Sequence, residues 1–472
     1  MPVDLTKPLE WKTATGDAAA MLSQLQPNIL KGHVRQHMQI LFVQFSDKAE
    51  GRAFLHNVAR KMKSAKKHLL EVDRFNGPDH VEGSVYIGVG ITQTGYAKLG
   101  IPANKVPGAG DGTAAPFRDG MRSGASVQAL ADPPVTSWEA TFRHTIHAVV
   151  LIGDRKKASV TATRTAIDAL FTPGVKLLGV ETARHQENAQ GVGIEHFGYV
   201  DGRSQPLFLA EDIAAEPHTP AGWDPKFALG RVLVKDKAAP NPVQHFGSFF
   251  VFRKLEQNVR RFHQAEKDLA DALGLVGADR RRAGATIVGR FRDGTPLTSQ
   301  ATNGAQPVPN DFNYSGDDGR KCPFHGHIRK TNPRGSGGAE DPVDPAGERR
   351  HIMARRGQVY GTRSDDINAE LPPSARPTKG VGLLFMAFNS QVSEQFEFTQ
   401  QTWADNTGFP FNSSHGNPGL DQVIGQGTRP KTKCPVAWNG ATFKTVDAAP
   451  QAVTMKGGEY FFMPSIAFLK SL

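Results

Sequence analysis

Two histidines and a cysteine lie close together in the segment KCPFHGHIRKTNPRG, which spans residues 321–335. Thiolate and imidazole are both metal ligands, and Cys322, His325 and His327 could supply three of the roughly four ligands that zinc needs. The other cysteine, Cys434, stands alone, and the C-x-x-C-H pattern of covalently attached haem is absent. A cysteine-ligated haem at Cys322 is an alternative, but a histidine ligand is simpler because imidazole suits iron. These residues alone leave a metal site, a haem site and a solvated basic loop open.

Three glycine-rich segments carry further polar side chains. FGYVDGRSQP (197–206) places Asp201 between glycines, RRGQVYG (355–361) begins with two arginines, and GLDQVIGQG (419–427) contains Asp421. Aspartate next to glycine is common in turns, and an arginine pair is common on a protein surface. By themselves, the two aspartate segments therefore indicate turns, and RRGQVYG indicates a glycine-broken strand with a surface pair of arginines.

The elements that must position these residues begin with two strand–helix–strand units in the first half of the chain. The predicted strands are 37–45, 84–92, 144–153 and 175–186, and helices are predicted after the first strand to about residue 62 and over 156–171. A loop rich in glycine, proline and alanine is expected over about 101–137. This order suits an antiparallel sheet with helices on one face, which is a ferredoxin-like arrangement.

The second half predicts a similar unit. A strand at 247–255 precedes a segment whose apolar side chains recur at helical spacing from Leu255 to Leu273. After a structure-poor region over about 300–348, the apolar segments are 351–361, 380–390 and 458–468, with a helix-like stretch at 391–405. A loop as long as the structure-poor region is usually functional or disordered. We therefore expect an α+β protein of two ferredoxin-like units with antiparallel sheets, with domains 1–215 and 216–472.

The composition is that of an ordinary globular protein. The chain has 472 residues, of which 39% are hydrophobic and 22% charged, and its formal net charge of +10 favours anionic partners. The basic residues are spread along the chain, so we expect no nucleic-acid footprint. Two cysteines suggest a reducing compartment. No secretory signal is visible and no apolar run could span a bilayer, so we expect a cytoplasmic protein without a membrane partner.

Taken in order, the segments resemble one known family. GYVDG, CPFHGHIRKTNPR, RRGQVYG, GLLFMAF (382–388) and GLDQVIGQ follow one another as in the dye-decolorising peroxidases, which are haem enzymes built from two ferredoxin-like units. PFRDGM (116–121) and GGEYFFMPS (457–465) also look like that family. The resemblance covers nearly the whole chain and is closest to the larger subfamilies. It implies one haem b per chain, held mainly by the C-terminal domain.

The resemblance assigns roles around the proximal face of the haem. His327, which immediately precedes the IRK triplet, matches the iron ligand, and His325 is a loop residue. Arg329, two positions after the ligand, is expected near a haem propionate, because a guanidinium pairs with a carboxylate in a fork geometry. Asp421 matches the carboxylate that accepts the other N–H of the proximal imidazole, which makes the imidazole more basic.

On the distal face, Asp201 matches the base that moves the peroxide proton, and Arg355 matches the cation that stabilises the charge of the breaking O–O bond. Leu383 and Phe385 would wall the pocket. Trp403 and Tyr360 lie where the family has redox-active side chains, so they are possible surface radical sites for bulky substrates.

The implied activity is the reduction of hydrogen peroxide with single-electron oxidation of anionic dyes and phenolic or aromatic small molecules. Two alternatives remain from the sequence. The first is a haem carrier or a haem deferrochelatase on the same fold, and the second is a basic, haem-free protein that binds nucleic acid or anionic polymers.

Overall fold

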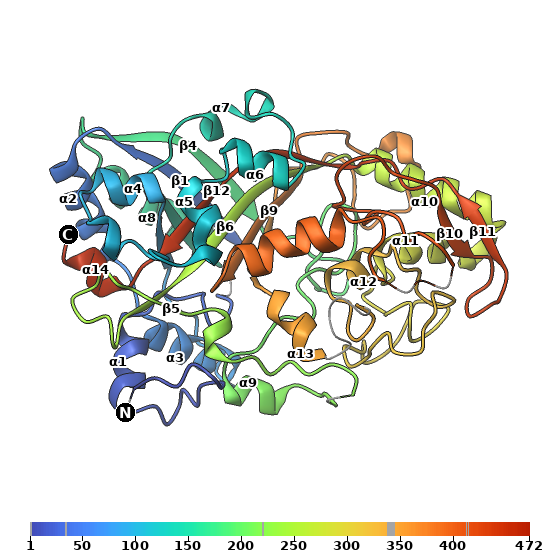
Figure 1. Cartoon of the computed structure of the whole chain (residues 1–472), viewed down its shortest axis with the longest axis horizontal. Helices are drawn as coiled ribbons and strands as arrows, with labels where there is room; N and C mark the ends of the chain where they lie inside the picture. Colours follow the sequence, from blue (N-terminus) through green and yellow to red (C-terminus); the bar gives the residue numbers. More distant parts are fainter. Residues whose placement is uncertain (1, 34, 220, 338–344, 412, 414) are drawn as a thin grey trace.

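The computed structural model describes residues 2–33, 35–219, 221–337, 345–411, 413 and 415–472 (Figure 1). The strands are β1 His37–Phe45, β2 Tyr86–Ile91, β3 Ala148–Asp154, β4 Val175–Arg184, β5 Val234–Lys235, β6 Phe246–Gln257, β7 Ala354–Arg355, β8 Gln358–Tyr360, β9 Gly382–Asn389, β10 Thr432–Pro435, β11 Phe443–Val446 and β12 Val453–Met463. The α-helices are α1 Gly16–Gln24, α2 Lys48–Ala59, α3 Ala65–Asn76, α4 Gln93–Lys98, α5 Ala115–Asp119, α6 Gly124–Ala129, α7 Ala140–Arg143, α8 Lys157–Asp168, α9 Ala210–Ala215, α10 Val259–Leu273, α11 Arg281–Val288, α12 His327–Thr331, α13 Pro345–Glu348 and α14 Ile466–Lys470. Two π-helical turns, η8 Ser393–Glu397 and η9 Thr399–Ala404, follow β9.

The first four strands form an antiparallel sheet in the spatial order β4–β1–β3–β2. Helices α2 and α3 follow β1, and α8 connects β3 to β4. This is the predicted ferredoxin-like arrangement. The segment 101–137, predicted as a loop, also contains the short helices α5 and α6. Local capping explains them, since Pro116 lies in the first turn of α5 and the Ser123 side chain accepts from the backbone N–H of Ser126 in α6.

Strands from the second half repeat this order as β12–β6–β9–β8. Helix α10 follows β6, and the π-helical turns lie between β9 and β12. The apolar segment 351–361 forms two short strands instead of one. Arg356 and Gly357 separate β7 from β8, because glycine weakens a strand interior.

The two sheets join at both edges. Ile91 of β2 pairs with Phe462 of β12, and Ala183 of β4 pairs with Tyr360 of β8. Strands of both halves therefore close into a barrel, which leaves few free edges. The domain boundary between residues 215 and 216 stays a prediction.

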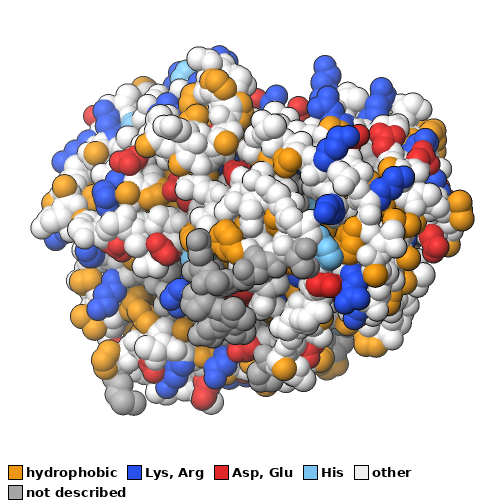
Figure 2. Space-filling view, turned by 45° about the vertical axis from the view of Figure 1, so that its right-hand side comes forward, with side chains coloured by type: hydrophobic (Ala, Val, Ile, Leu, Met, Phe, Trp, Pro, Cys, Tyr) orange, Lys and Arg blue, Asp and Glu red, His pale blue; other side chains and the backbone are white. Residues whose placement is uncertain are grey.

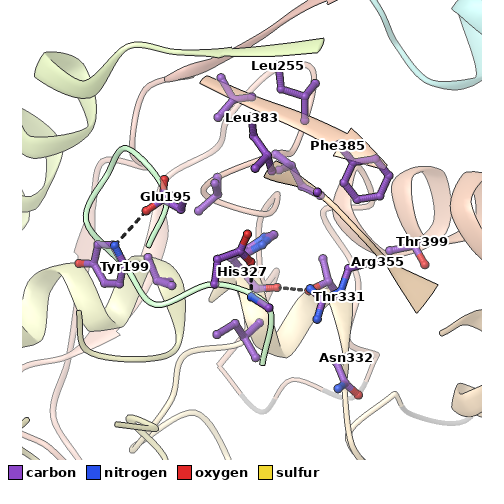
Figure 3. A pocket seen from close by; sticks show the side chains of 18 of the residues that line it. Glu195, Tyr199, Leu255, His327, Thr331, Asn332, Arg355, Leu383, Phe385 and Thr399 are labelled. Atoms are coloured by element: carbon purple, nitrogen blue, oxygen red, sulfur yellow. Dashed lines mark hydrogen bonds between the residues drawn. The ribbon is translucent and has the colours of Figure 1, made fainter. Parts of the chain in front are cut away.

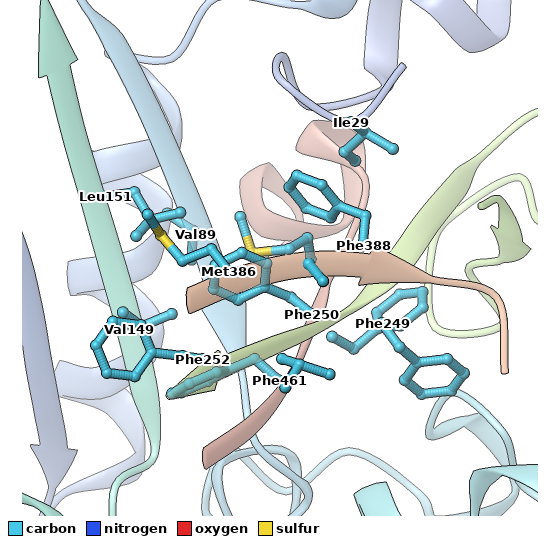
Figure 4. Packing of buried hydrophobic residues seen from close by; sticks show 14 of the residues in the cluster. Ile29, Val89, Val149, Leu151, Phe249, Phe250, Phe252, Met386, Phe388 and Phe461 are labelled. Carbon is cyan, nitrogen blue, oxygen red and sulfur yellow. The ribbon is translucent and has the colours of Figure 1, made fainter. Parts of the chain in front are cut away.

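The barrel interior is packed with large apolar side chains from both halves (Figure 4). Phe250 and Phe252 of β6 lie beside Phe388 and Met386 of β9, to which they are paired in register. Side chains alternate across a strand, so the other face of β9 points outward and carries different residues. That outer face is one wall of the cavity described below.

Candidate active site

A cavity of about 240 Å³ lies on the outer face of the second sheet. Its walls include parts of β6, β7, β9, η9 and α12, together with the loops that contain residues 195–204 and 423–426. Leu255 of β6 and Leu383 and Phe385 of β9 form an apolar wall (Figure 3). The predicted pocket residues Leu383 and Phe385 therefore do line the cavity, because both have the same parity on β9.

His327 lies across the cavity from this wall, at the first position of α12 (Figure 3). Its ring Nδ1 is hydrogen-bonded to Asp421 Oδ2 at 2.8 Å. The other carboxylate oxygen of Asp421 accepts from the backbone N–H groups of Val423 (2.7 Å) and Ile424 (2.9 Å), so this fully buried side chain is held at both ends. Nδ1 is thus engaged, and Nε2 remains the ring nitrogen available to a ligand in the cavity.

The charges of this pair reinforce each other. Burial alone would lower the pKa of His327, but the neighbouring carboxylate of Asp421 outweighs it and raises the pKa. Burial would raise the pKa of Asp421, but His327 and the two backbone N–H groups lower it. The result is an imidazole made strongly basic by a buried anion.

The other two candidate ligands of this segment face elsewhere. His325 is buried, its Nε2 lies 3.6 Å from the Cys434 sulfur, and burial lowers the pKa of its imidazole to about 3. Cys322 is buried beside Phe312 and Tyr314. Among the described residues, no group of three or more His, Cys, Asp or Glu side chains is arranged to hold a metal ion.

Arg355 and Asp201 both line the cavity. The Arg355 guanidinium donates from Nη2 to the backbone carbonyl of Arg203 at 2.7 Å, and its backbone N–H donates to Gln205 Oε1 at 3.1 Å. Burial lowers the pKa of Arg355, and Asp201 opposes that shift. The loop that carries Asp201 thus also holds Arg355 in place. Gly202, which follows Asp201, has a φ of +78°, a backbone conformation that favours glycine.

Arg329 does not line the cavity. Its buried guanidinium forms an ion pair with Asp317 (3.1 Å) and donates to the carbonyls of Asp317 and Cys322. It also lies over the rings of Tyr314 and Phe324. The structure therefore places this arginine in the scaffold of the loop, because an aspartate inside the loop satisfies it.

Trp403 and Tyr360 are not surface residues, contrary to the sequence prediction. Trp403 is 0% exposed and stacks on Phe409. The ring of His351, which lines the cavity, has its centre 5.3 Å from the centre of the Trp403 ring. Tyr360 is 7% exposed and pairs with Ala183 at a seam of the barrel. Aromatic side chains at these positions fill the core, which motif matching does not reveal.

Several cavity residues were missed by the sequence analysis. Arg203, Tyr199 and Glu195 lie in or next to the segment around Asp201, so that segment could have indicated them. Arg290 also lines the cavity, but no local pattern marks it.

Similarity to known proteins agrees with this geometry. A family model described as the DyP dimeric alpha+beta barrel domain matches residues 24–184. The chain is 56% identical to the multifunctional dye peroxidase of Amycolatopsis sp., and the match covers 100% of both chains. The chain belongs to the dye-decolorising peroxidase family. The solved structure of the Amycolatopsis protein matches this dye-decolorising peroxidase with a TM-score of 0.94 at 55% identity over 100% of each chain.

More distant members of the family share the fold. The DyP-type peroxidase of Anabaena sp. has a TM-score of 0.88 at 36% identity, covering 99% of this chain and 98% of its own. A dye-decolorizing peroxidase of Auricularia auricula-judae is 30% identical over 94% of this chain and 85% of its own. The predicted family, the α+β fold of two ferredoxin-like units and the peroxidase class are confirmed, and peroxidases of this family are haem enzymes. None of the described helices is long and apolar enough to cross a membrane.

Proposed function

We propose that this dye-decolorising peroxidase binds one haem b in the cavity, where His327 Nε2 would hold the iron. In this proposal it reduces hydrogen peroxide and oxidises anionic dyes and phenolic or aromatic small molecules by single-electron steps. The observation that carries the proposal is the buried Asp421–His327 pair on one side of a cavity that Arg355 and Asp201 also line.

The side chains present fit a haem. The imidazole of His327 would hold the iron through Nε2, and Leu383, Phe385 and Leu255 would offer an apolar surface to the porphyrin. For the propionates we propose Arg290 and Arg203, because these arginines line the cavity whereas Arg329 does not. When bound, the haem supplies the iron at which peroxide reacts and the store of oxidising equivalents.

Each polar residue then has a defined task. Asp201, which is exposed to solvent, accepts the proton of the incoming peroxide and returns it to the departing oxygen. Arg355 presents a fixed positive charge to the oxygen on which negative charge develops, and the Arg203 carbonyl prevents its reorientation. Asp421 keeps the proton on His327 Nδ1, so that Nε2 stays a strong donor.

The substrate proposal follows from charge and access. The formal net charge of +10 attracts anionic dyes. Figure 2 shows Lys and Arg side chains scattered among acidic and apolar side chains over the face of the molecule drawn there. This scatter suits small anions better than a nucleic-acid backbone, so we propose no nucleic-acid partner.

Electron transfer through Trp403 or Tyr360 stays a prediction. Because both side chains are buried, they would relay electrons inside the protein and not at its surface. We also infer a cytoplasmic location, because both cysteines are free thiols.

Two alanine variants test the ligand assignment. His327→Ala should lose most of the haem or change its absorption spectrum, whereas His325→Ala should keep both because His325 contacts Cys434 instead of the cavity. The opposite pattern would refute the assignment. A wild-type protein that binds haem but does not turn over peroxide would instead favour a haem carrier or deferrochelatase.

A further inference from the structure

One tyrosine of the cavity wall has a carboxylate as its hydrogen-bond partner. Tyr199 lines the cavity and is 5% exposed, and Figure 3 shows its hydroxyl directed away from His327. That hydroxyl donates to Glu266 Oε1 at 2.5 Å. Tyr199 therefore reaches from the cavity to the Glu266 carboxylate on α10, 67 positions further along the chain, whose side chain is 12% exposed.

Glu266 is held in its ionised form by two further partners. Its Oε2 lies 2.7 Å from Arg292 Nη2 and 2.6 Å from His263 Nδ1. Burial would raise the pKa of Glu266, but Arg292 and His263 outweigh it and lower the pKa to about 2. The phenol of Tyr199 keeps its proton, because burial raises its pKa well above the usual range. The pair at rest is thus a protonated phenol beside a carboxylate that can still accept a proton in mild acid.

A glycine makes room for this contact. A Cβ atom placed on Gly284 of α11 would lie 2.0 Å from the Tyr199 hydroxyl oxygen and 2.2 Å from Glu266 Oε1. Both atoms are at the ends of side chains, so a larger residue would separate the phenol from the carboxylate before it disturbed the helix. The backbone also fixes the tyrosine segment, because Val200 N–H donates to the Arg292 carbonyl at 3.1 Å.

Of the six tyrosines of the chain, all of which lie in the described residues, one both lines the cavity and hydrogen-bonds to a carboxylate. Only Tyr199 and Tyr460 hydrogen-bond to a carboxylate, and Tyr460 binds Glu397 at 2.7 Å. Tyr460 does not line the cavity. Tyr360 does not line it either, and its buried hydroxyl has no hydrogen-bond partner in the described residues. Removing a proton from a buried phenol requires an acceptor, so Tyr199 is the tyrosine best placed for oxidation from the cavity.

We propose that Tyr199, with Glu266 as its proton acceptor, is a redox-active residue that carries one oxidising equivalent from the cavity toward the surface at Arg292. The proposal rests on the proposed peroxidase function, which supplies the oxidant. Tyr199 gives one electron to the peroxide-oxidised cofactor, its O–H bond breaks, and the proton moves to Glu266, leaving a neutral phenoxyl radical. An aromatic donor too large for the cavity then returns an electron to Tyr199, and Glu266 returns the proton. The Arg292 side chain is 45% exposed, so this end of the pair is close to solvent.

The test is electron paramagnetic resonance of the haem-loaded protein, frozen after mixing with hydrogen peroxide. Protein made with ring-deuterated tyrosine should show a narrowed radical signal, which identifies a tyrosyl species. Tyr199→Phe should lose this signal. Tyr460→Phe, which removes a phenol from the other buried tyrosine–carboxylate pair, should keep it.

Two variants retain the phenol and remove only its proton acceptor. Glu266→Gln cannot take the proton as a carboxylate does, and Gly284→Ala separates the two groups while keeping both. Both should lower the yield of the tyrosyl signal, while the haem absorption still responds to peroxide. A Tyr199→Phe protein with a tyrosyl signal of unchanged shape and yield would overturn the proposal. If the wild-type haem absorption does not respond to peroxide at all, the proposed function falls, and this inference falls with it.

Discussion

The Asp421→Asn variant tests how much the buried carboxylate contributes to the proximal histidine. Both oxygens of Asp421 accept hydrogen bonds, one from His327 and the other from Val423 and Ile424. An amide has one accepting oxygen, so in either orientation its NH₂ group faces an N–H donor. The variant therefore loses a charge-assisted hydrogen bond, which contributes about 1.5–3 kcal/mol.

This loss should appear in the reduction potential of the haem-loaded protein. A less basic imidazole stabilises the oxidised iron less, so the potential should rise. For a one-electron couple, each tenfold change in the equilibrium constant corresponds to about 59 mV. The lost hydrogen-bond energy therefore raises the reduction potential by roughly 65–130 mV if all of it falls on the oxidised state. The haem affinity should also fall by about 10- to 100-fold, as for other partners of metal-bound histidines. A spectrophotometric redox titration measures the first quantity, and haem transfer to an acceptor protein measures the second.

Asp405→Asn is the matched control for this experiment. Asp405 is a neighbouring carboxylate that accepts from the Gln426 N–H and the Gln400 side chain instead of His327. Burial raises its pKa to about 7, so in mildly acidic buffer it is protonated and the substitution changes little charge. The reduction potential of the haem-loaded Asp405→Asn protein should therefore stay near that of the wild type. If Asp421→Asn binds haem and also keeps the wild-type potential, the carboxylate does not tune His327 and the reasoning is wrong.

Three further outcomes follow from the structure. Arg355→Leu should slow the peroxide reaction in stopped-flow by on the order of 10²–10³, whereas Arg356→Leu should mainly lower stability, because Arg356 donates to the Asn28 and Ile29 carbonyls; equal rate losses would contradict the assignment. Asp201→Asn should remove the activity in mild acid, since an amide cannot accept the proton, and a pH–rate profile identical to the wild type would exclude Asp201 as the base. Burial raises the pKa of Asp405 in the folded protein to about 7, whereas its pKa in the unfolded chain is about 3.9. The stabilisation that the protonated Asp405 contributes is fully present below about pH 3.9. It is lost as the pH rises through about 7, which lowers the free energy of unfolding by up to about 4 kcal/mol. Asp405→Asn should therefore show a smaller fall in unfolding free energy from mild acid to mild alkali, measured by urea titration at both pH values.

The local pattern of the sequence was enough to predict several of the strands and helices and part of the site. Strand β1 has the predicted bounds, and α8 lies within the predicted helix, because apolar periodicity and branched side chains act over a few neighbouring residues. The ordered motifs also indicated His327, Asp201, Arg355 and Asp421, which all occur in short segments with a fixed local spacing. The structure brings His327 and Asp421 into contact and places His327, Asp201 and Arg355 on one cavity.

Contacts between distant segments were decided only by the tertiary structure. Arg329 lies where the motif predicts a residue of the haem site, yet its guanidinium pairs with Asp317 and does not line the cavity. Trp403 packs against His351, which comes from a distant segment of the chain. The Tyr199–Glu266 pair depends on α10, on α11 and on the missing side chain of Gly284. A sequence pattern records which face of an element is apolar. Which partner each polar side chain finds depends on how the elements pack, because burial forces it to satisfy its hydrogen bonds with whatever group is nearest.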